Sequence, residues 1–387
     1  MSDSFDDLEQ ILATKGTSAA VELLCQDLKE RKDFTALFYA LLMKKRLDLG
    51  VSPIPTGPAQ DLPQNIHGPY EEAVRDAARV AGRLYLDDGN IPGAWAFFRM
   101  IGEPAPVREA LEKAEPKPGE ESAALIDIAF HQGVHPTKGF DWVLEHNGIC
   151  NAITMLSSQD GSHDPAAREY SIKRLVRALH ADLVQNLASH IERVQNFRPS
   201  SNDIYELIAG RDWLFAEDSY HIDVSHLSSV VQLSMNLPVS EELELARQLC
   251  EYGTHLSSRL QFTADWPFEH HFKDYAVYLS ILADDNVEEG LAHFRNKVES
   301  ADVEEMGTFA AEIYVNLLVR SGRDQEALAV ARRYLAKADG QRLSCPGIVE
   351  LCEKTGDYQT LAQVAREQNN AVHFLAALLA GKALVAP

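Results

Sequence analysis

Histidine is the residue type whose placement in this sequence could support chemistry. The chain has 387 residues and 14 histidines, and eleven of these lie between residues 131 and 271. An uncharged imidazole can act as a metal ligand or as a general base near neutral pH. If the chain has a catalytic site, we therefore predict it in this histidine-rich block. Four histidines are the candidate metal ligands: His131, His221, His226 and His271.

The first candidate is paired in sequence with a carboxylate. His131 follows Asp127 by four residues, on a segment of helical periodicity that spans residues 123–132. Two side chains at that spacing share one face of a helix, so Asp127 could orient the imidazole as a metal ligand or a general base requires. An ordinary hydrogen bond within a helix is the alternative.

A dense polar cluster carries His221 and His226. Asp223 or Ser225 is the expected N-cap of the helix that follows, which places His226 in its first turn. The helix dipole disfavours a charged imidazole there, and a neutral one could bind a metal or serve as a base. A capping loop with two incidental histidines is the alternative.

The last candidate lies on an aromatic helix face. The apolar spacing over residues 268–283 places His271 on the inward side together with Tyr275. A histidine of the core, satisfied by hydrogen bonds, is the alternative. If the four histidines converge, they would suit zinc or non-haem iron, with Glu217, Asp218 or Asp223 as a further carboxylate ligand. The reaction would then rest on a metal-bound water or on dioxygen.

Helices must position these side chains. Apolar residues recur at i, i+3, i+4 and i+7 over residues 70–88, 309–321 and 325–337, which is the pattern of helices that bury one face. The two-residue alternation of half-buried strands is hard to find. The predicted fold class is therefore all-α.

An internal repeat accompanies the helical periodicity. Turn residues at 285, 322 and 356 recur at intervals close to about 34 residues, and a similar turn lies at Gly89. In three of these stretches a small residue that allows close helix approach is followed by a large one that fills the groove: Ala94 and Trp95, Gly290 and Leu291, Ala327 and Leu328. The pattern resembles tetratricopeptide helix pairs. The resemblance implies antiparallel pairs stacked into an α-solenoid, either extended or irregular and compact.

Proline and glycine divide the chain. Five prolines between residues 51 and 69 predict a loop, because proline at that density excludes helix. Residues 115–121 read as a short linker. The predicted divisions are an N-terminal helical hairpin, a Pro-rich loop, a repeat-like helix pair, a linker, a His-rich middle block and C-terminal repeats: 1–50, 51–69, 70–114, 115–121, 122–271 and 272–387.

Charge and cysteine content limit the partners and the compartment. A net charge of −22 disfavours nucleic acid and anionic membrane surfaces and favours a protein partner with a basic patch. The N-terminus lacks the features of a secretory signal. Five scattered cysteines without a C-x-x-C pair fit reduced thiols, which predicts a cytoplasmic protein.

Three functions remain open from the sequence. Nucleotide-binding, serine-hydrolase and zinc-protease motifs are absent. The leading hypothesis is a scaffold that binds a protein partner in the groove between helix pairs. The alternative is a zinc- or iron-dependent enzyme built on the four histidines. A third is a small-molecule cavity lined by Trp142, Phe215 and Tyr275.

Overall fold

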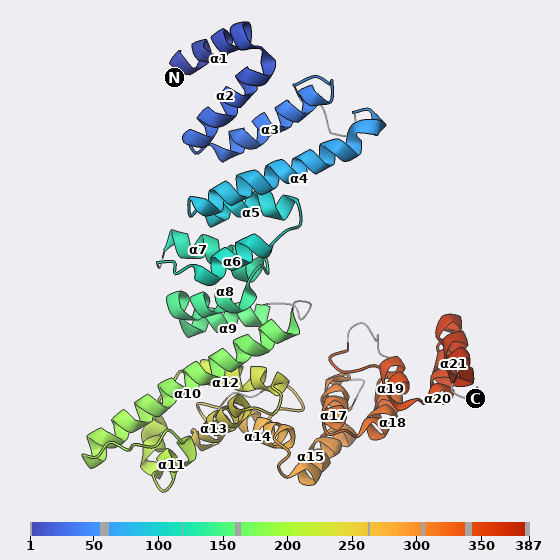
Figure 1. Cartoon of the computed structure of the whole chain (residues 1–387). Helices are drawn as coiled ribbons and strands as arrows, with labels where there is room; N and C mark the ends of the chain where they lie inside the picture. Colours follow the sequence, from blue (N-terminus) through green and yellow to red (C-terminus); the bar gives the residue numbers. More distant parts are fainter. Residues whose placement is uncertain are drawn as a thin grey trace. The chain divides into compact units, whose positions relative to one another are not determined.

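The computed structural model describes residues 2–54, 62–117, 119–158, 164–261, 264–302, 306–336 and 343–383. Within these ranges the chain is helical and has no strand, so the all-α prediction is confirmed (Figure 1). No helix in the described ranges has both the length and the apolar character needed to cross a membrane. The chain divides into two compact units, Met1–Ala152 and Ile153–Pro387, which are described separately.

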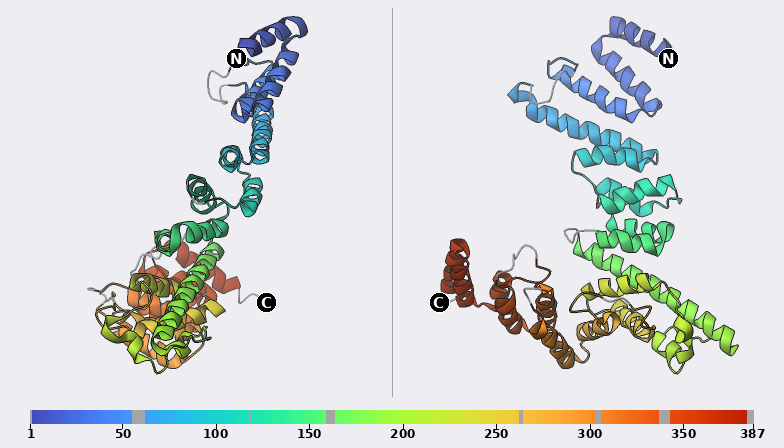
Figure 2. Two further views of the ribbon diagram at one scale, coloured as in Figure 1. Left: turned by 90° about the vertical axis from the view of Figure 1, so that its left-hand side faces the viewer. Right: turned by 180° about the vertical axis from the view of Figure 1, so that it is seen from behind.

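Unit 1 is a succession of helices, and each of its first five contacts the next one along the chain. Figures 1 and 2 show α1 to α5 lying side by side in chain order. The helices of unit 1 are α1 (Ser2–Lys15), α2 (Thr17–Glu30), α3 (Phe34–Asp48), α4 (Gln64–Asp87), α5 (Ile91–Met100), α6 (Ala105–Lys113), α7 (Glu120–Ile126), α8 (Pro136–Trp142) and the start of α9 (Gly148–Ser158). Two π-helical turns, Asp127–His131 and Val143–Asn147, follow α7 and α8 directly.

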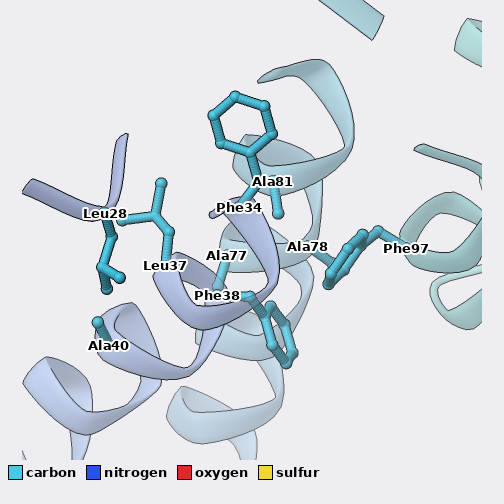
Figure 3. Close-up of a cluster of buried hydrophobic side chains, with 9 residues drawn as sticks. All are labelled: Leu28, Phe34, Leu37, Phe38, Ala40, Ala77, Ala78, Ala81 and Phe97. Atoms are coloured by element: carbon cyan, nitrogen blue, oxygen red, sulfur yellow. The ribbon is translucent and has the colours of Figure 1, made fainter. Parts of the chain in front are cut away.

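Small residues on α4 explain how closely the helices of unit 1 approach one another. Ala78 and Ala81 are fully buried, and Figure 3 shows the rings of Phe34 and Phe38 on α3 in the same cluster. A Cβ added to Gly82 would come within 2.7 Å of the Phe98 ring on α5. Alanine and glycine at these positions therefore leave room for the aromatic rings of the neighbouring helices.

The predicted Pro-rich loop over residues 51–69 is wrong at its C-terminal end. Helix α4 begins at Gln64 and contains Pro69. Pro63 takes the N-cap position, where a missing N–H is tolerated. Pro69 lies six residues into a long helix, and the rest of α4 packs against α3 and α5. The other prolines of this segment include Pro55 and Pro58, which lie outside the described residues.

Unit 2 begins with one long helix. α10 contacts α12 and α13 (Figure 1). The helices of unit 2 are α10 (Pro165–Gln195), α11 (Ile204–Ile208), the 3-10 segment η4 (Asp212–Asp218), α12 (Val224–Leu233), α13 (Glu241–His255), α14 (His271–Leu282), α15 (Val287–Ser300), α17 (Phe309–Arg320), α18 (Asp324–Tyr334), α19 (Ile348–Thr355), α20 (Tyr358–Glu367) and α21 (Ala371–Ala383).

The residues that carried the repeat pattern lie where helices pack in pairs. α14 contacts α15, α17 contacts α18, and α19 contacts α20. A Cβ on Gly290 would come within 2.5 Å of Ile281 on α14, so a side chain there would force α15 away. Ala327 is fully buried, and Leu291 and Leu328 are buried beside these small residues. In the α14–α15 and α17–α18 pairs, a small residue on the second helix therefore allows close contact with the first.

Candidate functional site

A connected polar site in unit 2 is centred on His221, between η4 and α12. The backbone N–H of His221 donates to the Tyr252 hydroxyl at 2.8 Å, and its Nδ1 lies 3.0 Å from the same oxygen. Its Nε2 lies 2.8 Å from Nδ1 of His190 on α10. The Asn186 amide donates to the His221 carbonyl at 2.8 Å. Helices α10 and α13 thus hold this segment from two sides. We call His190, His221 and Tyr252 the His221 site.

Donor and acceptor roles set the direction of this hydrogen-bonded chain. The Tyr252 oxygen accepts the His221 N–H, so its own proton is available for Nδ1 of His221. A neutral His221 that accepts at Nδ1 carries its proton on Nε2 and donates it to Nδ1 of His190. His190 then carries its proton on Nε2. Both ring nitrogens of His221 are therefore engaged by the protein itself.

Burial keeps His221 uncharged at neutral pH. Desolvation, together with His190 and Arg193, lowers the pKa of His221 to about 4. Burial also raises the pKa of Tyr252 well above its ordinary range. The Phe215 ring packs 5.3 Å from the Tyr252 ring, between centroids. The His221 site is therefore a hydrogen-bonded chain that runs from the buried Tyr252 through a neutral His221 to Nδ1 of His190.

Asp223 is the N-cap of α12, which confirms the predicted cap. His226 lies in the first turn of that helix, as predicted. The Asp223 carboxylate accepts the N–H groups of Ser225 and His226 at 2.8 and 3.3 Å. The Ser225 hydroxyl donates to the same oxygen, and this bond is the largest of the effects that lower the pKa of Asp223. His226 is the third residue of α12. These contacts stabilise the start of α12 and match the capping interpretation.

His271 is a buried histidine of the α12–α14 contact. It is 4% exposed, and Tyr275 is 3% exposed, so the predicted inward face is correct. Its Nε2 lies 2.7 Å from the Ser228 hydroxyl on α12, and its ring stands edge-on to Tyr275 at 4.7 Å. Burial lowers the pKa of His271, while Ser228 and Asp274 act in the opposite direction. His271 therefore packs and hydrogen-bonds as a core residue.

The structure gives Asp127 a different partner from the one predicted. Residues 127–131 form a π-helical turn, in which the contact repeats at five residues instead of four. Asp127 accepts a hydrogen bond from the Gln132 amide at 2.6 Å, and Gln132 in turn accepts from the Trp95 indole at 2.5 Å. His131 is exposed and lies edge-on to its neighbour Phe130.

The four candidate ligands do not form one metal centre. Across the described ranges, no three His, Cys, Asp or Glu side chains are grouped so that they could hold a metal ion. His131, His221, His226 and His271 all lie in those ranges. Both ring nitrogens of His221 are engaged by His190 and Tyr252, and Nε2 of His271 by Ser228, while Nδ1 of His271 is buried without a hydrogen-bond partner among the described residues. Of the aromatic residues expected to line a cavity, Phe215 packs on Tyr252 and His255, and Tyr275 stacks on Phe268.

Sequence reasoning missed His190 and Tyr252. A usable signal was present, because His190 follows Leu187 by three residues and Tyr252 follows Leu249 by three. Both therefore continue the apolar stripes of their helices. A polar side chain on such a stripe requires a hydrogen-bond partner inside the protein.

A second polar cluster joins α14 and α15. The Lys297 ammonium lies 2.7 Å from Glu269 Oε1 and 2.9 Å from Asp274 Oδ1, and it donates to the Pro267 carbonyl at 2.6 Å. Nε2 of His293 lies 2.8 Å from Asp274 Oδ1. We call Lys297, Glu269, Asp274 and His293 the Lys297 cluster. All three ammonium protons are used, so Lys297 offers no free amine and acts as a structural tie.

A groove lies between α15 and the α17–α18 pair, with a volume of about 270 Å³. Its apolar floor includes Val298 and Val330. Arg295 Nε donates to the Tyr314 hydroxyl at 3.0 Å. We call this the α15–α18 groove; it is lined by Arg295, Val298, Glu299, Tyr314, Glu326, Ala329, Val330, Arg333 and Tyr334. The groove thus combines an apolar floor, two tyrosines and charges of both signs.

Known proteins do not add to this description. The chain matches no protein-family model, no curated protein and no solved structure. The functional argument therefore rests on the geometry of the residues.

Proposed function

We propose that this chain is a helical-repeat scaffold that binds a protein partner in the α15–α18 groove. The single observation that supports this most is the side-chain content of the groove. Tyrosine and arginine dominate the binding energy of protein interfaces, and Tyr314, Tyr334, Arg295 and Arg333 all line it. The apolar floor between them would receive one anchoring side chain of the partner.

The helix pairs support a tetratricopeptide-like, irregular array. The turns that precede the second helix of α17–α18 and of α19–α20 contain Gly322 and Gly356, with φ of 74° and 71°. Such left-handed geometry favours glycine and reverses the chain within a few residues. Stacked pairs of this kind leave a groove between one pair and the next, and the α15–α18 groove occupies that position.

Charge suggests the partner and the compartment. With a net charge of −22, the chain attracts a basic partner surface, and Glu299 and Glu326 at the groove would receive its cations. Cys25, Cys250, Cys345 and Cys352 are free thiols, which fits a reducing, cytoplasmic environment. We expect binding to weaken as salt is raised, because exposed charge pairs are screened.

The test fills the groove without touching the core. Ala329 is exposed on α18 and lines the groove, so Ala329→Trp should occupy the floor. The matched control is Ala292→Trp, at an exposed position on α15 that does not line the groove. The immobilised full chain and its Ala292→Trp variant should retain the same partner from a cell extract. The Ala329→Trp variant should retain at least tenfold less.

Cross-linking tests where on the chain the partner binds. A photoreactive phenylalanine analogue at position 329 should capture the retained protein, and the same analogue at position 292 should not. Equal retention by both tryptophan variants, or cross-linking from position 292 alone, would show that the groove is not the binding surface.

A further inference from the structure

Unit 1 has an apolar pocket of a different kind. It lies among α2, α3 and the start of α4, with a volume of about 500 Å³. That volume falls in the range of about 300–1,000 Å³ typical of small-molecule sites. We call it the Arg46 pocket; it is lined by Leu24, Leu28, Ala36, Tyr39, Ala40, Leu42, Met43, Arg46, Pro53 and Tyr70. Nine of these ten residues are apolar or aromatic, so Arg46 is the only charged side chain in the lining.

Arg46 is a buried cation, and no carboxylate among the described residues pairs with it. It is 7% exposed. Its Nε donates to the Ser52 carbonyl at 2.6 Å, and its guanidinium lies 5.7 Å from the centre of the Tyr70 ring. The two terminal Nη atoms make no hydrogen bond to another described residue, and neither is among the buried atoms that lack a partner, so both reach the open space of the pocket. A guanidinium does not lose its proton, and a buried charge without a partner is costly.

The chemistry of the lining selects the ligand. Two free Nη groups match the two oxygens of one carboxylate, in the fork geometry that arginine favours. A phosphate dianion would require further cations or donors, and the lining offers only the tyrosine hydroxyls besides Arg46. The remaining wall of Leu, Ala and Met side chains suits a hydrocarbon chain.

We propose that the Arg46 pocket binds a free aliphatic monocarboxylate, whose carboxylate pairs with Arg46 and whose chain lies between α2 and α3. The site is independent of the α15–α18 groove, which belongs to unit 2. The back wall of the pocket includes Leu28 and Ala40, which belong to the apolar core of unit 1 (Figure 3). The site is therefore built into the packed part of the unit.

Titration calorimetry of the full chain with octanoate and decanoate tests the proposal. Each buried methylene should strengthen binding about fourfold, so decanoate should bind about sixteenfold more tightly than octanoate. Decanamide has the same chain without the charge and should bind at least tenfold more weakly than decanoate. Arg46→Met should weaken decanoate at least tenfold and leave decanamide unchanged.

Two further variants guard against loss of fold. Ala36→Phe keeps Arg46 and fills the pocket, so it should abolish binding of both ligands. Arg83→Met removes an exposed cation of α4 outside the pocket and should change neither affinity. Circular dichroism would establish that each variant is folded.

The results that would overturn the proposal are equally specific. They are the absence of saturable decanoate binding, equal binding of decanoate and decanamide, or unchanged decanoate binding in a folded Ala36→Phe variant. Tighter binding of an acetylated hexapeptide with a C-terminal leucine carboxylate would also overturn it, because it would assign the pocket to the end of a protein chain.

Discussion

The two units bury different kinds of side chain. Among the described residues, unit 1 buries two polar side chains, Arg46 and Ser122. Unit 2 buries many more: Ser171, His180, Ser234, Glu242, Gln248, His271, Asp274, Lys297 and Glu312. Unit 1 is held mainly by apolar contacts, which are not directional. Unit 2 adds hydrogen bonds and ion pairs that tie each element to specific partners.

The two units also differ in how they accommodate a buried charge. In unit 2 the buried charges are paired or hydrogen-bonded: Lys297 pairs with Glu269 and Asp274, and Glu312 accepts hydrogen bonds from Thr308 and Ser344. In unit 1 the buried charge of Arg46 faces a cavity. A polar group buried for structural reasons usually has its partner within the protein. Since no described carboxylate pairs with Arg46, its burial is better explained by a ligand than by the fold.

The largest expected effect comes from breaking the Lys297 cluster. Lys297→Met removes this cation from the buried carboxylate of Asp274 and the half-buried one of Glu269, which should lower the free energy of unfolding of unit 2 by about 3–5 kcal/mol. Urea unfolding, with hydrogen exchange of α14 and α15, measures the loss. The control Lys273→Met changes an exposed lysine on α14. A loss below about 1 kcal/mol would mean that the cluster is not a structural tie.

The His221 site should make unit 2 sensitive to acid. The unfolded chain takes up a proton on His221 near its ordinary pKa of 6.5, whereas the folded chain does so only near 4. Stability should therefore be fully present above pH 6.5 and fall as the pH drops toward 4, by about 2–3 kcal/mol from this residue.

His221→Asn isolates that contribution. Asparagine offers an amide oxygen near the position of Nδ1 but does not titrate. The variant should be less stable than the wild type at pH 7.5 and should lose less stability between pH 6.5 and 4. Parallel pH profiles of the two proteins, from denaturant midpoints, would contradict the assignment of a neutral His221.

Glycine-to-alanine substitutions should show that both units pack aromatic rings closely against glycine. A Cβ on Gly82 in unit 1 or on Gly253 in unit 2 would come within 2.7 or 2.5 Å of a phenylalanine ring. Gly→Ala at either position should cost about 1–2 kcal/mol, because overpacking outweighs the better helix propensity of alanine. Gly381→Ala, whose Cβ would make an ordinary 3.8 Å contact, should be neutral or stabilising. Thermal melts would measure all three, and a neutral Gly82→Ala would show that unit 1 packs loosely.

The sequence by itself determined the features that depend on near neighbours in the chain. Helical periodicity follows from which residues face inward at each turn, so the all-α class and the inward face of His271 and Tyr275 were readable. The Asp223 cap was readable too, because a cap bonds to backbone groups two or three residues away.

Tertiary structure decided which side chains meet. The His221 site joins residues of α10 and α13 to the segment before α12, and no spacing in the sequence encodes that contact. Packing also placed Pro69 inside α4 despite its missing N–H. It formed a π-helical turn in which Asp127 accepts a hydrogen bond from Gln132. The pocket around Arg46 exists only because three helices enclose it. Local patterns set which face of a helix is apolar, but the burial of a charge depends on what the rest of the chain packs against it.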